Sequence, residues 1–301
     1  MFTKHTSLII PTKDRFDLLN KTILYLFDNK INFKEIIIVD SSKKENKKKM
    51  ILLCEKYRIK LLFTKASTSY QRNYGKKFVK KSKYLMFLDD DIIFFKDSFK
   101  EMNNAIKKYN SAAGFCFNIV SQKKKKIINH IKESKFMASL KLYSKKKGIV
   151  LHNGWHTQLF NLNNDTKVQW MYSGATIFKF EEIKERYFLV DKSPYCYLED
   201  LDFTYSLYKE KKILMCISKA RVLNPNIYLR NTFEFGFKEI KNRYHFVKKN
   251  NLNLRLFFLT SLIKFIFIFF EIFKFKFEIM FRLLGNISGI IYCLILNSFK
   301  K

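Results

Sequence analysis

Short apolar runs alternate with amphipathic stretches over the first hundred residues of the chain. Four runs of four or five residues contain almost no polar side chains, as in strands covered on both faces, and they predict strands at 7–10, 35–39, 59–63 and 84–88. Apolar residues at helical spacing predict helices at 17–29, 70–81 and 97–109, and we expect Asp17 to cap the first. The alternation predicts β-α-β units, and therefore an α/β fold with a mostly parallel sheet.

The pattern weakens between residues 110 and 165, where Lys, Asn and Ser are frequent. His152 and His156 lie in this stretch with no acidic or cysteine neighbour at metal-ligand spacing, so we interpret them as loop residues. The pattern returns with an apolar segment at 168–180, a helix at 181–186, an acidic helix start at Glu199 and a strand at 213–218. A long irregular stretch inside a domain is more often functional than idle.

The last fifty residues are much more apolar than the rest. Residues 256–270 carry one charge, Lys264, and as a helix they would cover roughly 22 Å, less than the ~30 Å hydrocarbon core of a bilayer. Such Phe-rich helices with scattered cations suit the headgroup region of a membrane. Two alternatives stay open, namely packing on the globular domain as ordinary core and a single spanning helix at 283–296. We predict a globular domain at 1–230 and a helical, membrane-associating tail at 231–301.

The formal net charge of +32 on 301 residues would suit a nucleic-acid partner. Of the 58 basic residues, however, 49 are Lys and nine are Arg, whereas proteins that read bases use Arg for bidentate contacts to guanine. The excess of Lys accompanies many Asn, Ile and Phe residues, as in a proteome-wide compositional bias. We therefore predict no nucleic-acid partner, and an anionic membrane surface as a partner of the tail.

The five cysteines are widely spaced and include no CxxC pair. Their number and spacing favour neither a disulfide framework nor a zinc site, which indicates a reducing compartment. The apolar run near the N-terminus stops at Pro11 and is too short for a signal peptide. We expect the protein at the cytoplasmic face of the cell membrane.

Three carboxylates, Asp89, Asp90 and Asp91, follow the predicted strand at 84–88. Ligands of open α/β sheets bind at this end of the strands. Strand alternation would place Asp89 and Asp91 on one side and Asp90 on the other, and we expect a positive group to offset their repulsion. Two carboxylates on one side suit Mg²⁺ or Mn²⁺ that also holds a diphosphate. The alternative is a solvated acidic turn.

A second acidic group, Glu199, Asp200 and Asp202, begins a predicted helix. Carboxylates in a first helical turn interact favourably with the helix dipole, so helix capping alone would explain them. Combined with the first cluster, they provide a base for an incoming hydroxyl while a metal holds a leaving group. This combination is typical of a transferase.

Six segments occur in an order that resembles one enzyme family, namely SLIIPTKDR, IIIVDSS, STSYQRNYG, FLDDD, WMYSGATIF and LEDLDFTY. Between about residues 5 and 225 the chain is similar to inverting glycosyltransferases of family 2, whose GT-A fold is a Rossmann-like, mixed but mostly parallel sheet flanked by helices. Each segment alone is a weak signal, and the specificity lies in the ordered set. The resemblance implies transfer of a hexosyl or deoxyhexosyl group from a nucleotide-diphosphate sugar to a hydroxyl, with inversion.

The resemblance also implies roles for single residues on the donor side. It implies contacts to the nucleotide-sugar from Pro11, Thr12, Arg15, Asp40, Arg72, Asn73, Asp89 and Asp90. Within this set, Asp40 would recognise the base and Arg72 with Asn73 would lie beside the nucleotide-sugar. Asp91 and Asp89 would hold a divalent metal, Mg²⁺ or Mn²⁺.

On the acceptor side, the resemblance implies a loop beneath the donor sugar at Ser173 and Gly174, with Trp170 beside it. Asp200 would be the catalytic base and Glu199 the second choice. Structural explanations compete with these roles. Asp40 could cap a turn with Ser41 and Ser42, Arg72 could be a surface helix residue, and Trp170 could be core.

Two positions depart from the family pattern. Ser206 stands where many relatives have Arg, and Asn224 stands where a His often ends the strand after 213–218. Neither touches the expected metal or base positions, so we expect an active enzyme.

The segment 230–250 resembles the stretch before membrane-associating tails in bacterial polysaccharide and rhamnosyl-type transferases. The expected acceptor is therefore lipid-linked or a cell-surface glycan, because sharing one surface raises the effective concentration of enzyme and acceptor. Two other classes stay open: a metal-dependent nucleotidyltransferase, and a non-catalytic membrane adaptor with the same fold.

Overall fold

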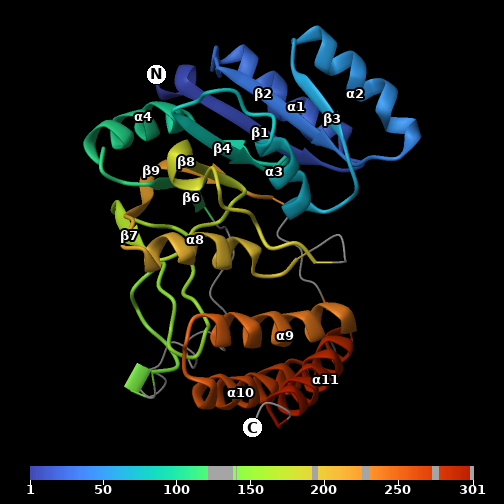
Figure 1. Cartoon of the computed structure of the whole chain (residues 1–301), viewed down its shortest axis with the longest axis vertical. Helices are drawn as coiled ribbons and strands as arrows, with labels where there is room; N and C mark the ends of the chain where they lie inside the picture. Colours follow the sequence, from blue (N-terminus) through green and yellow to red (C-terminus); the bar gives the residue numbers. More distant parts are fainter. Residues whose placement is uncertain (121–137, 140, 192–195, 226–230, 273–277, 299–301) are drawn as a thin grey trace. The chain divides into compact units, whose positions relative to one another are not determined.

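The computed structural model describes residues 1–120, 138–139, 141–191, 196–225, 231–272 and 278–298 (Figure 1). The chain forms two compact units. The first combines Met1–Ser121 with Leu159–Asn226, and the second combines Gln122–Gln158 with Ile227–Lys301. The division into 1–230 and 231–301 stays a prediction, and residue 230 lies outside the described residues.

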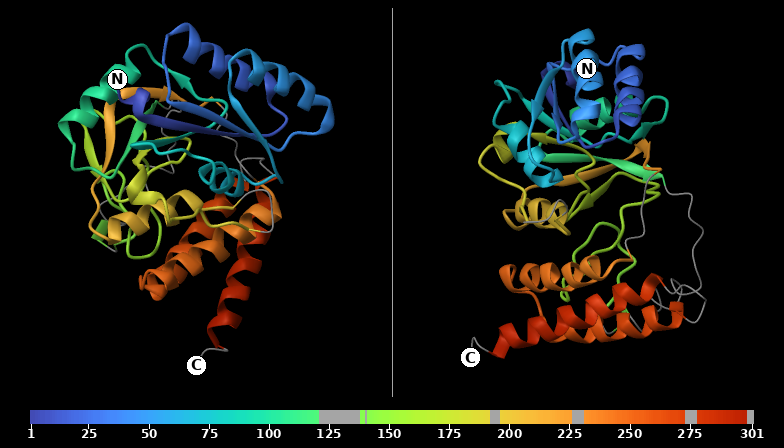
Figure 2. Two further views of the ribbon diagram at one scale, coloured as in Figure 1. Left: turned by 45° about the horizontal axis from the view of Figure 1, so that its top comes forward. Right: turned by 90° about the vertical axis from the view of Figure 1, so that its right-hand side faces the viewer.

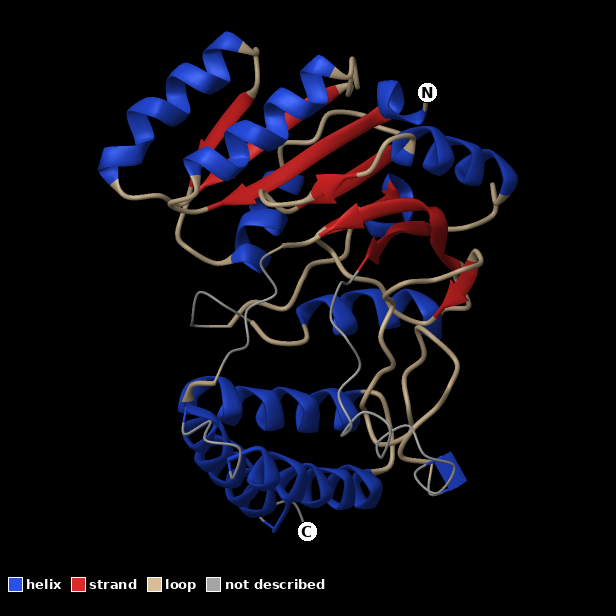
Figure 3. Cartoon of the chain, turned by 180° about the vertical axis from the view of Figure 1, so that it is seen from behind, coloured by secondary structure: helices blue, strands red, loops and turns tan. Residues whose placement is uncertain are grey.

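A mixed sheet forms the centre of the first unit, in the order β3-β2-β1-β4-β8-β6-β9-β5, with β7 paired to β9. The four predicted strands are confirmed as β1 Thr6–Thr12, β2 Glu35–Asp40, β3 Lys60–Phe63 and β4 Tyr84–Leu88. They pair in parallel, so their carboxyl ends lie at one edge. The α/β class is therefore confirmed (Figure 3).

The other half of the sheet adds β5 Ile93–Phe94, β6 Gly114–Val120, β7 Thr166–Val168, β8 Ala175–Lys179 and β9 Leu214–Leu223. Strand β8 runs antiparallel to β4 and β6, while β6 and β9 run parallel. The sequence did not predict β6, because its run GFCFNIV begins a region dominated by polar residues. The strand predicted at 213–218 is longer, because exposed Lys219 and Arg221 alternate with buried Ala220 and Val222.

The helices of the first unit are α1 Phe16–Asp28, α2 Lys44–Lys56, α3 Thr68–Lys76, α4 Ser98–Lys108, α7 Phe180–Ile183 and α8 Glu199–Lys209, after a short 3-10 turn, η1, at Phe2–His5. Helix α2 was not predicted, because lysines fill its first half and leave a short apolar face. The capping role expected of Asp17 is wrong: Arg15 occupies the N-cap position and makes no capping hydrogen bond there. The helix expected at 70–81 ends at Lys76.

Alternate residues of the central strands enter two cores, so helices cover both faces of the sheet. Leu8 and Ile10 pack in one core with residues of α1, α2 and α4. Ile9 faces the other side, where a Cβ on Gly75 of α3 would lie 3.0 Å from its Cγ2. On that same side Phe87 contacts Phe188, whose ring stacks on Phe203 of α8. Helices α3 and α8 are therefore positioned at the strand ends that carry the acidic residues.

Three long helices form most of the second unit: α9 Phe233–Lys249, α10 Leu254–Ile272 and α11 Glu278–Ser298 (Figure 2). Their core joins Ile240, Tyr244 and Val247 of α9 to Phe257 of α10 and Cys293 of α11. The stretch Ile279–Ser298 has a mean hydropathy of 1.9 and is long and apolar enough to cross a membrane.

Candidate functional site

The loops after β1 and β4 meet around Asp90. Thr12 Oγ1 donates a hydrogen bond to Asp90 Oδ2 at 2.7 Å, and Arg15 Nη1 lies 3.2 Å from Asp90 Oδ1 and 3.0 Å from Asp91 Oδ2. Thr22 of α1 donates to the backbone oxygen of Asp90 at 3.0 Å. Burial raises the pKa of Asp90 to about 6, although Thr12 and Arg15 lower it.

The arrangement of the three aspartates differs from the strand alternation that we expected. Asp90 and Asp91 share Arg15, whereas Asp89 faces Arg72. The reason is that β4 ends at Leu88, so the twofold alternation does not continue through the turn at Asp90 and Asp91. The expected positive partners are confirmed, and they are two arginines.

Arg72 joins the two acidic motifs. Its Nη2 lies 2.8 Å from Asp89 Oδ1, and its Nη1 lies 3.3 Å from Asp200 Oδ1 and 3.8 Å from Glu199 Oε1. The side chain is 3% exposed, so the interpretation as a surface helix residue is wrong. Burial alone would lower the pKa of Arg72, but Asp89, Asp200 and Glu199 raise it, and the guanidinium stays charged.

Glu199 and Asp200 begin α8 after Leu198, which has a positive φ of 73°. Burial, and then the charge of Asp200, raise the pKa of Glu199 to about 8, and Arg72 opposes this. Burial also raises the pKa of Asp200, while Arg72 and Ser173 lower it. One carboxyl of this adjacent pair therefore keeps its proton more readily than an ordinary acid.

Asp40 is fully buried at the end of β2. The backbone N–H and Oγ of Ser42 donate to its Oδ1 at 2.8 and 2.5 Å, so the turn-capping interpretation holds for this oxygen. Its Oδ2 has no hydrogen-bond partner among the described residues. Since Asp40 pairs in register with Thr12, this carboxylate lies beside the end of β1, which carries Pro11 and leads to Arg15.

Three other polar side chains of α3 form hydrogen bonds with the backbone of neighbouring segments. Asn73 donates to the carbonyl and accepts from the N–H of Phe188, both at 2.8 Å. Lys76 Nζ donates to the carbonyls of Ile183 and Lys184 at 2.9 Å. Gln71 Nε2 donates to the carbonyls of Thr12 and Val39 at 2.8 and 2.7 Å.

Sequence reasoning missed Gln71 and Lys76, although both are buried polar residues of the segment STSYQRNYGK. A signal was present in the spacing of Gln71 and Gly75, which lie one turn apart and share a helical face. Nothing in the sequence tells that this face packs on β1 and β2.

The loop before β8 approaches Asp89 closely. The backbone N–H of Asp89 donates to the carbonyl of Gly174 at 2.8 Å, and a Cβ on Gly174 would overlap Asp89 Oδ2. Only glycine fits here without moving that carboxylate. Ser173 is buried beside Asp200. The side chain of Trp170 is 2% exposed and packs on Tyr172, with the ring centroids 4.6 Å apart. This burial agrees with the core interpretation of Trp170.

The two departures from the family pattern lie outside this cluster. Ser206 Oγ accepts from Arg186 Nη1 at 3.3 Å, and Arg186 also pairs with Glu210. An arginine from another segment therefore reaches Ser206. Asn224 directly follows β9.

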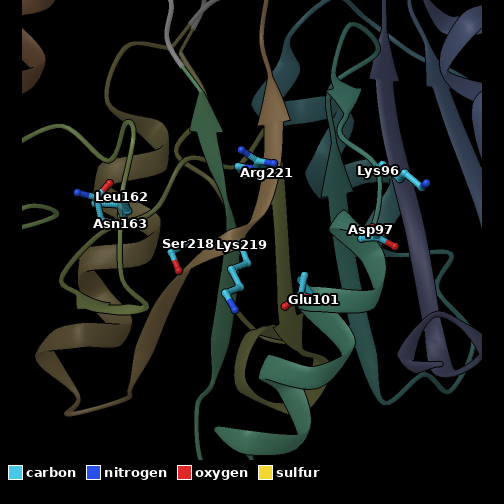
Figure 4. A pocket seen from close by; sticks show the side chains of 8 residues that line it. All are labelled: Lys96, Asp97, Glu101, Leu162, Asn163, Ser218, Lys219 and Arg221. Carbon is cyan, nitrogen blue, oxygen red and sulfur yellow. The ribbon is translucent and has the colours of Figure 1, made fainter.

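A cavity of about 370 Å³ is lined by other residues of the first unit (Figure 4). It is lined by Lys96, Asp97, Glu101, Leu162, Asn163, Ser218, Lys219 and Arg221. None of the residues predicted from the sequence lines it. The sequence motifs therefore converge on the arginine-linked acidic cluster and not on this cavity.

The carboxylates of the acidic cluster could serve as ligands of a metal ion. In the part of the chain that the structure describes, no three His, Cys, Asp or Glu residues gather as a metal site. Asp89 and Asp91 nevertheless offer carboxylate oxygens, and Mg²⁺ commonly uses one or two carboxylates and completes its shell with substrate phosphates and water. The residues fit a shared metal of this kind, not a metal held by the protein alone.

The model of glycosyl transferase family 2 matches residues 7–166. The chain therefore belongs to this family. The match includes Ser7 to Thr12 of β1, the Asp40 turn, α3 and the three aspartates, and so confirms the family resemblance over the first four of the six ordered segments. The segments at 170–178 and 198–205 lie beyond it. No curated protein matches the chain in sequence.

Solved structures agree on the fold. GalNAc-T7, crystallised with UDP, GalNAc and Mn²⁺, gives a TM-score of 0.50 at 14% identity over 73% of this chain and 43% of its own. TarS 1–349 of S. aureus gives 0.51 at 15% identity over 85% and 71%, and TarS as a whole gives 0.52 at 14% identity over 85% and 41%. The chain thus spans less than half of GalNAc-T7 and of the longer TarS chain, and at these identities the likeness concerns the fold.

Proposed function

We propose that the protein is an inverting glycosyltransferase that moves a sugar from a nucleotide-diphosphate sugar to a hydroxyl of a lipid-linked or glycan acceptor. One observation carries the proposal. Arg72 binds Asp89 of the first acidic motif and Asp200 of the second, so a donor-binding group and a candidate base flank one buried guanidinium. Glycosyl transfer needs both at one reacting centre.

Donor binding is assigned to the carboxyl ends of β1, β2 and β4. The free oxygen of Asp40 offers an acceptor for N–H groups of a base, since a buried carboxylate oxygen without a partner is costly. Thr12 and Arg15 keep Asp90 and Asp91 in place, and Pro11 precedes Thr12 in β1. GalNAc-T7 was crystallised with UDP, which supports a nucleotide diphosphate as the ligand class.

Asp89 and Asp91 would hold a divalent metal, Mg²⁺ or Mn²⁺. When bound, such an ion offsets the negative charge of the diphosphate leaving group. Mn²⁺ in the GalNAc-T7 crystals supports this choice. The protein's own contribution is to orient the two carboxylates through Arg72 and Arg15.

Asp200 acts as the general base in this proposal. Its raised pKa makes it a stronger base than an ordinary aspartate, and the ion pair with Arg72 fixes its direction. It takes the proton of the acceptor hydroxyl as the oxygen attacks the anomeric carbon from the face opposite the diphosphate. A single displacement of this kind inverts the anomeric centre. Glu199, whose pKa burial and the charge of Asp200 raise to about 8, stays protonated beside it at neutral pH.

The location proposed for the enzyme is the cytoplasmic face of the membrane, through the second unit. The apolar helix α11 and the basic character of residues 227–301, which contain thirteen basic and four acidic residues, support it. An enzyme held at that surface would meet a lipid-linked acceptor at high effective concentration.

Calorimetric titration tests the donor site. The full chain is titrated with UDP, GDP and dTDP, with and without Mn²⁺, beside Asp91→Asn and a control, Asp28→Asn, at the far end of α1. We expect one nucleotide to bind in a metal-dependent manner, with binding lost in Asp91→Asn and kept in the control. A folded protein that binds none of the three would favour the adaptor, and turnover of labelled nucleoside triphosphates without sugar transfer would favour a nucleotidyltransferase.

A further inference from the structure

Helices α10 and α11 place polar side chains inside the bundle and apolar side chains on its surface. Lys264 of α10 and Arg282 of α11 both pair with Glu239 of α9, and Arg282 Nη2 lies 2.9 Å from Glu239 Oε2. Asn286 donates to the carbonyl of Gly236 at 2.9 Å and to Glu239 at 3.3 Å. Lys264, Arg282 and Asn286 therefore point into the bundle, toward α9.

The opposite faces of the same helices are apolar and exposed. On α10 they carry Leu259, Leu262 and Ile266, which are 43 to 55% exposed and three or four residues apart. On α11 Phe281, Leu284, Ile287, Ile291 and Leu294 are exposed and again three or four residues apart. We call these eight residues the apolar face. A soluble bundle shows the reverse arrangement, with polar residues outside and apolar residues inside.

Helix α9 differs from its two partners. Its exposed positions are mainly polar or charged, including Glu234, His245 and Lys249. Its packing on α11 is too close to be loosened easily, because a Cβ on Gly236 would overlap the carbonyl oxygen of Arg282, and one on Gly285 would overlap that of Phe233. Phe237 and Tyr292 continue the contact with ring centroids 5.5 Å apart.

This packing decides between lying in and crossing a membrane. If α11 crossed the bilayer, α9 would enter the hydrocarbon beside it together with Glu234, His245 and Lys249. Charged side chains are strongly disfavoured at that depth. If α11 lies in the plane, its apolar face and that of α10 contact the acyl chains, while α9 stays among the headgroups.

We propose that the apolar face of α10 and α11 docks in the plane of an anionic lipid surface, with α9 on the headgroup side. Anionic lipid is the occupant because residues 231–301 carry twelve basic residues against four acidic ones. The docking rests on the membrane location proposed above and does not depend on the transferase chemistry.

Vesicle flotation of the full chain tests the docking. We expect binding to vesicles of phosphatidylglycerol and phosphatidylcholine, weaker binding to phosphatidylcholine alone, and weakening by salt. Ile266→Lys and Ile291→Lys should each lower the partition coefficient about tenfold, since each places a charge where a half-exposed isoleucine met lipid. Leu52→Lys is the matched control, because Leu52 is an exposed leucine of α2 in the other unit, 57% exposed.

Depth measurements separate the two membrane arrangements. Phe281→Trp, Ile287→Trp and Leu294→Trp are each made in a Trp155→Phe, Trp170→Phe background and quenched by lipids brominated at different acyl positions. Equal, shallow depths support docking in the plane. A clearly deeper Ile287→Trp overturns it in favour of a spanning helix.

Two further results would overturn the docking. One is unchanged vesicle binding by both lysine variants. The other is a dimer in vesicle-free buffer that Ile266→Lys dissociates, which would assign the apolar face to a second copy of the chain. Nucleotide titration of the same variants keeps these outcomes separate from failure of the transferase proposal, because the nucleotide site involves none of the substituted residues.

Discussion

Arg72 and Asp200 are 128 positions apart in the sequence, and Arg72 Nη1 lies 3.3 Å from Asp200 Oδ1. The same guanidinium binds Asp89 at 2.8 Å. A buried cation thus compensates carboxylates from both acidic motifs. Without it, the partly buried carboxylates of Asp89 and Asp200 would face each other beside buried Glu199 with no cation between them, which is unfavourable.

Removal of this cation should affect both stability and catalysis. We expect Arg72→Leu to lower the free energy of unfolding by about 1–3 kcal/mol, because it removes the shared cation from partly exposed Asp89 and Asp200 and from buried Glu199. Arg72→Lys keeps the charge but not the two-pronged geometry, and we expect a smaller loss of stability and a fall in kcat/KM of about a hundredfold. Urea unfolding and transfer assays measure the two effects. Arg58→Lys, at an exposed arginine, is the control, and equal effects of both Lys variants would contradict the assignment.

Asp200→Asn tests the proposed base. The substitution keeps the size of the side chain and removes its basicity, so we expect kcat to fall by about 10²–10⁴ while the affinity for the nucleotide changes little. Asp202→Asn, two residues further along α8, should leave kcat nearly unchanged. If Glu199→Gln abolishes activity and Asp200→Asn does not, the base is Glu199.

Gly174→Ala tests whether the position of Asp89 matters. The added Cβ would overlap Asp89 Oδ2, and the carboxylate is the group that can move. We expect metal-dependent nucleotide affinity to fall about tenfold, as for loss of one charge-assisted hydrogen bond. A double-mutant cycle with Asp89→Ala provides the check, because Gly174→Ala should then have no further effect on affinity. Additive losses would place the cause elsewhere.

The acidic cluster should also make stability depend on pH. The pKa of Glu199 is raised to about 8 and that of Asp90 to about 6, so the folded state binds more protons than the unfolded state between about pH 4.5 and 8. Stability from these groups is present at low pH and is lost as pH rises through that window. The pKa of Glu239 is lowered from its ordinary value of 4.5, so this residue changes stability only below about pH 4.5. Buried His156, whose pKa burial lowers, has the opposite effect below pH 6.5. We therefore expect the Tm to fall from pH 6.5 to pH 8 and the slope to flatten in Glu199→Gln but not in Glu45→Gln, on the exposed part of α2.

The strands that the sequence predicted correctly are those in which burial on both faces leaves a run of apolar residues, such as Leu8 to Ile10. Helix α2 lacks that signal, because its exposed side consists of lysines and only a narrow stripe with Met50 and Leu53 is buried. The hydrophobic pattern therefore predicts an element well where both of its faces are buried, and poorly where only a narrow stripe of side chains is buried.

The site divides in the same way. Its acidic residues could be found from the sequence, because clustered carboxylates at a strand end and a helix start are visible there. Their partners could not. Sharing of Arg15 by Asp90 and Asp91 depends on where β4 ends, and the junction made by Arg72 depends on packing of α3 and α8 on one face. Both contacts depend on tertiary structure, which the periodicity of the sequence does not predict.

The glycine contact between α9 and α11 makes a final prediction about the second unit. Gly285→Ala places a Cβ against the backbone carbonyl of Phe233, so the helices must separate, and we expect a loss of about 1–3 kcal/mol. Gly289→Ala should cost less, because its Cβ would lie 2.9 Å from Ile240 Cβ and 3.1 Å from the carbonyl oxygen of Phe237, which is a milder overlap than that of Gly285 with Phe233.

The two tryptophans allow each unit to be followed separately, because Trp155 belongs to the second unit and Trp170 to the first. Trp155 is a sensitive reporter, since Arg243 lies over its ring at 4.6 Å and Phe257 stacks at 5.7 Å. In a Trp170→Phe background, Gly285→Ala should lower the urea midpoint seen by Trp155. In a Trp155→Phe background, the midpoint seen by Trp170 should stay where it was. A shift of the Trp170 midpoint as large as that of Trp155 would mean that the two units unfold together, and that the glycine contact stabilises more than the bundle in which it lies.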